Sequence, residues 1–386
     1  MNTSPDRFFS HYGNASHKPR LFFAPGRVNL IGEHTDYNSG YVFPCALNYG
    51  TYLWIRSIPE PVMRFASENF DFKIEIPLPS LQNKINHEWV NYPLGVLDQL
   101  IRLGKHPNGA ELLYSGDIPN GAGLSSSASV EVVTAEAFDA LWKLDLKMID
   151  KIHISQKAEN EFVGMNCGIM DQFSVAMGQK EMALFLDCGT LDYELVPLKL
   201  DEFRLVVSNT NKRRGLTDSK YNERRNECEQ AVRDIKKVKQ IDTLSDMTLD
   251  EFEEVQHSIP DPKIRRRAHH VISENHRVLE AIPALKNGEL KKFGRLMNES
   301  HDSLKHDYEV TGPELDAMVE AARDVEGVIG SRMTGSGCGG CTVSLVAHPQ
   351  TDDFVQKVRS VYLKKTGLEP SFYFPEIGQG VRELPQ

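Results

Sequence analysis

The spacing of hydrophobic residues in the first half of the chain predicts a mixture of helices and strands. Residues 90–103 and 126–144 carry apolar side chains three and four positions apart, the period of a helix with one buried face. Short apolar runs bounded by glycine, proline and polar residues are typical of strands. The strands predicted in this half are residues 20–23, 112–114, 182–187 and 193–197, the last two forming a hairpin.

The second half continues the mixture with a larger share of helix. Its predicted elements are a strand at 204–208, a long charged helix from about Asp218, helices at 262–282, 288–303 and 313–324, and a strand at 342–346. Helices and strands do not follow a strict βαβ order, so we predict an α+β fold rather than a doubly wound parallel sheet. The length of 386 residues suggests two domains, which we place at residues 1–198 and 199–386.

Composition excludes several classes of protein. Hydrophobic residues make up 40% of the chain and charged residues 25%, which excludes a disordered chain. Lys and Arg number 44 against 54 Asp and Glu, a net charge of −10, so we expect no nucleic-acid partner. Residues 1–14 do not resemble a signal peptide, and there is no apolar run of membrane-spanning length. We therefore expect a cytoplasmic protein with no membrane contact, and no obligatory protein partner is evident.

The first candidate site is a polar cluster in residues 24–37. Glu33, His34 and Asp36 follow a short apolar run and lie between glycines. Carboxylates and an imidazole at this spacing can hydrogen-bond several hydroxyls of one small polyol. On composition alone, a solvated turn is the simpler interpretation.

The second candidate is a glycine- and serine-rich loop, residues 119–129, that leads directly into the predicted helix at 126–144. Such a loop presents free backbone N–H groups and the positive end of a helix dipole, which suits phosphate. The serine hydroxyls add donors and a hard ligand for Mg²⁺. The segment lacks the Walker A pattern, and the alternative is a flexible loop with a serine N-cap.

The third candidate is Asp171, in the segment 168–173. An aspartate here can accept the proton of a substrate hydroxyl, although a helix N-cap is the simpler interpretation. Upstream, Glu159 lies on a predicted helix, where most glutamates are solvated. Residues 335–340 match G-x-G-x-x-G but precede a strand, so we expect a wall beside the catalytic loop, not a dinucleotide site.

Other features receive ordinary interpretations. Arg265–Arg267 and Lys212–Arg214 are short charge runs, which are most often solvated. Three histidines share one predicted helix without metal spacing, so we interpret them as surface residues: His269, His270 and His276. Cys338 and Cys341 form a C-x-x-C inside the glycine-rich segment, and we expect small buried cysteines rather than a redox or zinc pair.

Taken together, the segments resemble the GHMP kinases (galacto-, homoserine, mevalonate and phosphomevalonate kinases). Residues 26–37, GRVNLIGEHTDY, are similar to the galactokinase signature. GLSSSA at 123–128 and GSGCGG at 335–340 are similar to the second and third motifs of the wider family, in the same order. One departure is Asn38-Ser39-Gly40, where the signature often continues Asn-Gly-Gly; its flexible neighbours can absorb the serine. The resemblance implies a two-domain fold with the active site between the domains and a ferredoxin-like C-terminal domain.

The resemblance also implies a role for individual residues. Asp171 corresponds to the catalytic aspartate, with Arg27 beside it to stabilise charge. Ser127 and Glu159 correspond to the Mg²⁺ ligands. Sugar-binding positions correspond to Glu33, His34, Thr35, Asp36, Gly168 and Tyr221. Positions near ATP correspond to Ser67, Gly121, Ala122, Gly123, Leu124, Ser125, Ser126 and Ser127.

The implied reaction is the ATP- and Mg²⁺-dependent phosphorylation of the C1 hydroxyl of α-D-galactose, yielding galactose 1-phosphate and ADP. Three alternatives stay open at this point. A kinase for a related sugar, such as N-acetylgalactosamine, galacturonate or arabinose, would use the same polar cluster. A catalytically silent sugar sensor is disfavoured because the serine loop, Arg27 and Asp171 are all present, and a mevalonate kinase because of residues 33–36.

Overall fold

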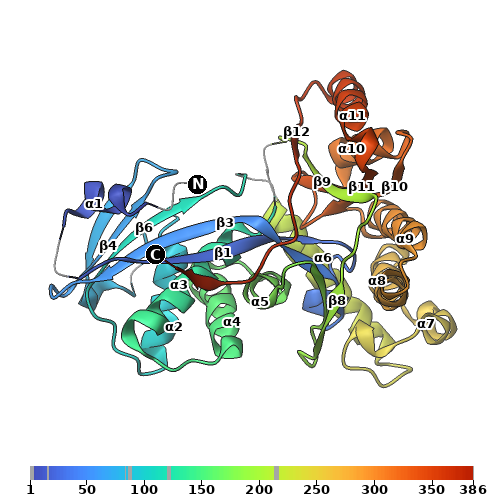
Figure 1. Cartoon of the computed structure of the whole chain (residues 1–386). Coiled ribbons are helices and arrows are strands. Elements are labelled where there is room, and N and C mark those ends of the chain that lie inside the picture. Colours follow the sequence, from blue (N-terminus) through green and yellow to red (C-terminus); the bar gives the residue numbers. More distant parts are fainter. Residues whose placement is uncertain are drawn as a thin grey trace.

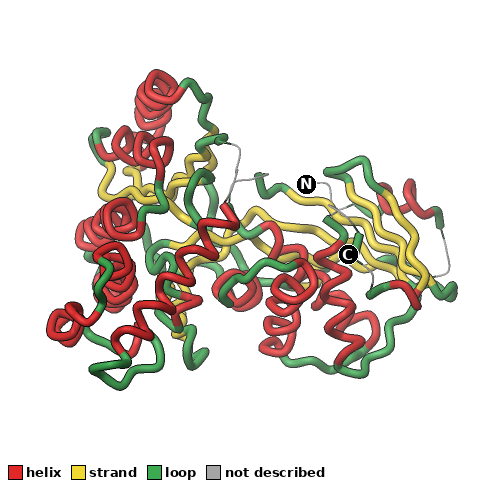
Figure 2. Tube along the Cα trace, turned by 180° about the vertical axis from the view of Figure 1, so that it is seen from behind, coloured by secondary structure: helices red, strands yellow, loops and turns green. Residues whose placement is uncertain are grey.

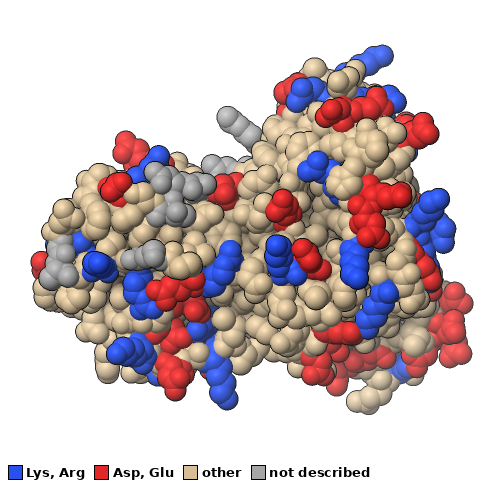
Figure 3. All heavy atoms as spheres, in the orientation of Figure 1, with Lys and Arg blue, Asp and Glu red and all other residues tan. Residues whose placement is uncertain are grey.

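The computed structural model consists of two lobes joined side by side (Figure 1). It describes residues 4–14, 17–82, 84–85, 89–119, 123–212 and 217–385, with side chains in the helix that starts at Thr217 described from Lys220 onward. One lobe holds a long curved sheet with helices beneath it, and the other holds a smaller sheet flanked by helices. In Figure 3, acidic and basic side chains are interspersed over the face shown.

The N-terminal lobe is built on a six-stranded sheet in the order β13-β1-β3-β6-β4-β5. Helices α2 to α5 lie against one face of this sheet, with α3 packed on β1 and β3, and α1 lies on the opposite face (Figures 1 and 2). A three-stranded sheet, β2-β7-β8, lies towards the other lobe. The bounds are α1 Asp6–Tyr12, β1 Arg20–Asn29, β2 Tyr41–Val42, β3 Pro44–Ser57, β4 Val62–Ser67, β5 Lys73–Pro77, α2 Asn91–Arg102, β6 Ala110–Gly116, α3 Ser126–Trp142, α4 Met148–Lys157, η3 Ala158–Val163, α5 Met170–Met177, β7 Met182–Asp187 and β8 Tyr193–Pro197.

The C-terminal lobe is built on a four-stranded sheet in the order β10-β11-β9-β12. Its long helices α8 and α9 pack against each other, and α9 packs on β10. The bounds are β9 Phe203–Asn209, α6 Thr217–Ile235, α7 Leu249–Val255, α8 Pro262–Lys286, α9 Leu290–Ser303, η6 Leu304–Tyr308, α10 Gly312–Arg323, β10 Val328–Thr334, β11 Cys341–Ala347, α11 Thr351–Thr366, β12 Ser371–Tyr373 and β13 Arg382–Leu384.

The end of the chain crosses back to the first lobe. Leu47 and Ile377 form a bridge, and β13 pairs antiparallel with β1 at the sheet edge. In Figure 1 this dark red segment runs from β12 across to β1. The domain boundary between residues 198 and 199 remains a prediction. The chain segment that begins at β9 ends in β13, which belongs to the six-stranded sheet of the N-terminal lobe.

The predicted elements agree with the structure, and the α+β class is confirmed. Among the strand pairs that the described residues form, β4–β6 is parallel and the others are antiparallel. The sequence did not predict β3, the longest strand. Its residues are buried on both faces and Pro44 and Gly50 interrupt it, so no two-residue alternation marks it.

Two surface interpretations were wrong. Arg267 is fully buried and pairs with Glu227 and Glu309, because the helix that carries it is enclosed by α6 and η6. His270 is also fully buried, whereas His269 is half-exposed.

Cys341 is buried as expected, and Cys338 is partly exposed. None of the described helices combines the length and apolar character that a membrane span requires.

Candidate active site

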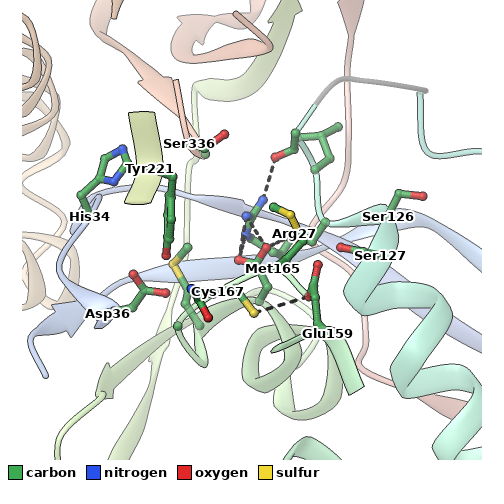
Figure 4. A pocket seen from close by; sticks show the side chains of 18 of the residues that line it. Arg27, His34, Asp36, Ser126, Ser127, Glu159, Met165, Cys167, Tyr221 and Ser336 are labelled. Carbon is green, nitrogen blue, oxygen red and sulfur yellow. Dashed lines mark hydrogen bonds and ion pairs between the residues drawn. The ribbon is translucent and has the colours of Figure 1, made fainter. Parts of the chain in front are cut away.

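The two lobes enclose a cavity of about 500 Å³. Its walls come from the end of β1 and the following loop, the segment before α3, the η3–α5 region, the first turns of α6 and the β10–β11 turn. These segments are far apart in the sequence, and Figure 4 shows their side chains pointing into one space. The predicted site residues that line the cavity are Arg27, Glu33, His34, Asp36, Gly123, Leu124, Ser125, Ser126, Ser127, Glu159, Gly168, Asp171 and Tyr221.

A fork-shaped ion pair between Arg27 and Asp171 lies at the centre of the cavity wall. Arg27 Nε donates to Asp171 Oδ1 at 2.8 Å, and Nη2 donates to Oδ2 at 2.8 Å. The remaining Arg27 nitrogen, Nη1, donates to the carbonyl of Gly123 at 2.8 Å. Two parallel charge-assisted hydrogen bonds fix both the position and the orientation of the carboxylate. Asp171 is in the first turn of α5, and its side chain is 28% exposed to the cavity.

The described part of the glycine-serine loop closes onto β1 and the β10–β11 turn. A Cβ atom on Gly26 would lie 2.6 Å from the carbonyl oxygen of Leu124, and one on Gly335 would lie 3.2 Å from that of Gly123. Glycine is needed at these points because the backbones approach so closely. The wall expected from residues 335–340 is thus confirmed, and the antiparallel β10–β11 connection is not a dinucleotide fold.

Ser125 caps α3 in a left-handed conformation with φ of 60°, and its hydroxyl donates to Asp171 Oδ2 at 2.6 Å. Ser126 and Ser127 form the first residues of α3, and both line the cavity (Figure 4). The positive end of the helix therefore faces the space beside Asp171. This placement supports the phosphate interpretation of the loop, which remains a prediction, and the sequence did not indicate that Ser125 also contacts Asp171.

The polar cluster after β1 is a buried loop, so the solvated-turn interpretation was wrong. Glu33 and His34 are 2% and 4% exposed, and Glu33 Oε2 forms an ion pair of 2.9 Å with Arg332 of β10. Thr35 is fully buried and does not line the cavity. Its hydroxyl donates to the carbonyl of Tyr41 at 2.7 Å and so holds the loop, and its predicted contact with a sugar stays a prediction.

Tyr221, at the first turns of α6, forms the opposite side of this region of the cavity. Its ring lies 5.9 Å from the His34 ring and 4.8 Å from the Tyr37 ring. Figure 4 shows its hydroxyl end directed towards Asp36 and Cys167. An aromatic face combined with nearby carboxylates is a common way to bind a sugar ring and its hydroxyls.

Negative charge is concentrated along the cavity. Burial, together with the neighbouring Asp171 carboxylate, raises the pKa of Asp36 to about 7. Burial and Asp171 likewise raise the pKa of Glu159 to about 7. Burial lowers the pKa of His34 to about 3, so its imidazole is neutral and can accept as well as donate a hydrogen bond.

Glu159 fits the carboxylate that a divalent cation requires. It is 7% exposed, in the η3 turn, and lines the cavity together with Ser127. Within the described ranges, no three His, Cys, Asp or Glu side chains form a complete metal cage. Mg²⁺ is commonly held by one or two protein oxygens together with substrate phosphates, so a single buried carboxylate beside a serine hydroxyl suits it.

Gln172 is a site residue that the sequence analysis missed. Its amide nitrogen Nε2 donates to Glu159 Oε2 at 2.7 Å and to Glu131 Oε2 at 3.1 Å. Glu131 is fully buried, and burial together with Glu159 raises its pKa well above the usual value. Gln172 thus holds the Glu159 carboxylate from behind. Gln172 directly follows Asp171 in the sequence, but a single glutamine carries no signal of its own, so only the structure shows its role.

One predicted ATP position among the described residues, Ser67, does not line the cavity. Gly121 and Ala122 lie outside the described residues. Ser67, at the end of β4, is 8% exposed, and its hydroxyl accepts the backbone N–H of Asn69 at 3.1 Å. Its proximity to nucleotide therefore stays a prediction.

Gly168 allows Asp36 to reach its position in the cavity. A Cβ atom on Gly168 would overlap the carboxylate carbon and Oδ2 of Asp36. Overpacking of this kind costs about 1–3 kcal/mol. For the galactose and ATP that the resemblance implies as substrates, we expect Gly168→Ala to displace Asp36 and raise the KM for galactose about 5- to 100-fold, with the KM for ATP unchanged, as measured by initial rates. The matched control is Cys167→Ala, which changes the preceding residue and leaves Gly168 in place; equal effects of the two changes would contradict the steric argument.

The lobes and the loops between them define a GHMP kinase. The model of the GHMP kinase N-terminal domain matches residues 91–179, and that of the C-terminal domain matches residues 281–362. The mevalonate kinase of Methanococcus jannaschii superimposes with a TM-score of 0.67 at 19% identity, covering 96% of this chain and 100% of that one. At this identity the likeness shows the fold alone.

Closer matches identify the family within this class. The model described as the galactokinase galactose-binding signature matches residues 6–57. A galactokinase from Clostridium acetobutylicum is 51% identical over 381 residues, which cover 98% of this chain and 96% of that protein. The galactokinase of Lactococcus lactis, solved in complex with galactose, superimposes with a TM-score of 0.96 at 42% identity, over 98% of both chains. The chain belongs to the galactokinase family.

Proposed function

We propose that this protein transfers the γ-phosphoryl group of Mg-ATP to the C1 hydroxyl of α-D-galactose, forming galactose 1-phosphate and ADP. The observation that carries the proposal is the Arg27–Asp171 pair, which lies between the sugar loop at 33–36 and the serine loop before α3. An acceptor alcohol bound by the first and a nucleotide bound by the second would meet at this carboxylate. The galactokinase relatives at about half identity over nearly the whole chain support the same substrate.

The residues supply position and charge rather than covalent chemistry, as phosphoryl transfer requires. Glu33, His34, Asp36 and Tyr221 would bind the sugar hydroxyls and orient C1 towards Asp171. The oxygen of C1 then forms the new bond to the γ-phosphorus while the bond to the β-phosphate oxygen breaks and ADP leaves. Asp171 would accept the proton of the C1 hydroxyl, a contribution of about 10²–10⁴-fold for general-base catalysis.

Arg27 would have two roles: it would orient the Asp171 carboxylate, and it would stabilise negative charge during phosphoryl transfer. Its guanidinium fixes the two oxygens of Asp171, and its contact with the Gly123 carbonyl keeps it against the serine loop. A buried cation at this place offsets the charge that develops between the acceptor oxygen and the phosphoryl group. Mg²⁺, held by Ser127 and Glu159, would neutralise negative charge on the β- and γ-phosphates.

Two alternatives, a kinase for a related sugar and a catalytically silent sugar sensor, are tested together by one set of candidate substrates. Purified protein is supplied with Mg-ATP and, in turn, galactose, N-acetylgalactosamine, galacturonate, arabinose, glucose and mevalonate, and ADP release is measured. The proposal expects galactose to give the largest kcat/KM. Stronger turnover of N-acetylgalactosamine would redirect the proposal to a kinase of that sugar. Galactose binding without ADP release from any compound would indicate a sensor.

The role of Glu159 as a metal ligand gives a separate prediction. Glu159→Gln removes the charge that binds the cation but preserves the shape, so we expect the Mg²⁺ concentration for half-maximal activity to rise about tenfold or more. Mn²⁺ binding in the presence of ADP, followed by its paramagnetic resonance signal, provides a readout independent of turnover. The control is Glu161→Gln, two residues along the same turn, whose side chain is 47% exposed. An unchanged metal titration would mean that Glu159 does not bind the cation.

A further inference from the structure

The loop that carries Glu33 and His34 is held by a helix of the other lobe. Helix α8 presents three side chains on one face to this loop. His270 Nε2 lies 3.1 Å from the carbonyl oxygen of Glu33. Glu274 Oε1 accepts the backbone N–H of Gly32 at 2.9 Å and of Glu33 at 3.1 Å, and Asn275 Oδ1 accepts the backbone N–H of Tyr41 at 2.9 Å.

The loop has two unusual backbone conformations, one that only glycine adopts readily and one that is costly for its residue. Gly32 has φ of +91°, and a Cβ atom there would lie 2.5 Å from the carbonyl oxygen of Tyr41. His34 has φ of 63°, a left-handed conformation that is costly for a residue with a side chain. Strained conformations persist where the surroundings determine them, and they concentrate at functional sites.

Glu274 is the centre of this restraint. It is fully buried, and Oε1 also accepts the Ser300 hydroxyl at 2.6 Å, while Oε2 accepts Arg277 Nε at 2.7 Å. Burial alone would raise its pKa, but Arg277 and the other nearby positive groups outweigh burial and lower the pKa to about 2. The group is therefore ionised, and its charge is paired with Arg277.

We propose that Glu274 is a positioning residue for the sugar: through the backbone N–H groups of Gly32 and Glu33, it holds the loop in the conformation that points Glu33 and His34 into the cavity. The inference rests on the proposed function, since it assigns the sugar to this part of the cavity. Glu274 itself does not line the cavity. Its effect must therefore be transmitted through the loop backbone. We expect it to change the binding of the sugar and not the binding of the nucleotide.

Two conservative substitutions separate this role from a merely structural one. Glu274→Gln retains the length of the side chain and an acceptor oxygen for the loop, but loses the charge that pairs with Arg277. Glu274→Asp retains the charge but is one methylene too short to reach both backbone N–H groups. If the ion pair with Arg277 were what mattered, the glutamine variant would be the more damaged of the two.

The experiment measures the KM values for galactose and ATP, kcat, and the rise in melting temperature that galactose produces. For Glu274→Asp we expect the galactose KM to rise about tenfold or more, with the ATP KM within about twofold of wild type and the galactose-induced stabilisation reduced. For Glu274→Gln we expect a galactose KM within about threefold of wild type. Glu280→Asp, at an exposed position on the same helix, is the control and should leave all values unchanged.

Each other outcome overturns the proposal. Equal effects of the two substitutions, a larger effect of glutamine, or a parallel rise in the ATP KM would assign Glu274 to general packing between the lobes. The aspartate variant cannot be interpreted if it shows no cooperative melting transition. In that case the glutamine variant alone tests the proposal, and a galactose KM more than about threefold above the wild-type value contradicts it. If the wild-type protein does not turn over galactose, the proposed function is refuted instead. The rise in melting temperature that galactose produces can then still be compared between wild type and the Glu274 variants, and it tests the positioning role separately.

Discussion

Replacing Asp171 by asparagine or alanine is expected to lower kcat for galactose phosphorylation by about 10²–10⁴-fold. Both changes remove the group that accepts the proton of the C1 hydroxyl. Neither removes the residues that line the rest of the cavity, so the KM values for galactose and ATP should change much less than kcat. ADP release under saturating substrates measures the effect, with melting temperature recorded for each variant.

The two substitutions also differ in their effect on stability. Asparagine keeps an oxygen that can accept from Arg27, whereas alanine leaves the Arg27 guanidinium, whose side chain is 5% exposed, without its carboxylate. An unpaired buried charge costs up to about 3–5 kcal/mol, so the alanine variant should have the lower melting temperature. Turnover near the wild-type value in a folded asparagine variant would exclude Asp171 as the base.

Replacing Arg27 by methionine is expected to lower kcat by about 10²–10³-fold, the effect of removing one preorganised electrostatic group. Methionine fills a similar volume but cannot donate to Asp171 or to the Gly123 carbonyl. The loss should appear in kcat and leave galactose affinity, measured by calorimetry, within about threefold of wild type.

Arg27→Lys is the matched control for this prediction. Lysine keeps the charge but cannot form the two parallel hydrogen bonds to the carboxylate. We expect its kcat to lie between those of wild type and the methionine variant, because charge is retained while the orientation of Asp171 is lost. A lysine variant as active as wild type would show that the fork geometry contributes nothing to the rate.

The centre of the site was predictable from sequence because each of its segments carries a local signal. The serine loop is recognisable by its glycines and by the helix that follows it, and residues 26–37 by an unusual order of polar residues. Physical reasoning from composition alone still favoured a solvated turn for Glu33–Asp36. The structure shows a buried loop, and it was the resemblance to a family that favoured a binding role over the solvated turn in advance.

Residues that act through their partners were not predictable in this way. Gln172, Glu274 and His270 each lie within ordinary helical sequence, and nothing in the spacing of their neighbours marks them. Their importance arises from contacts with segments that are distant in the chain, such as the 242 positions between Glu274 and Gly32. The same reason explains the wrong interpretation of Arg267, a residue of a charge run whose partners come from α6 and Glu309.

The sequence by itself determined the secondary elements with clear periodicity, the α+β class and the loops that carry the chemistry, because these depend on residues close together in the chain. The tertiary structure decided which side chains meet. It brought Arg27 to Asp171, placed α8 behind the sugar loop and returned the last strand to the first sheet. Such contacts depend on burial and on pairing between remote segments, and a local pattern of hydrophobic and polar residues carries no information about either.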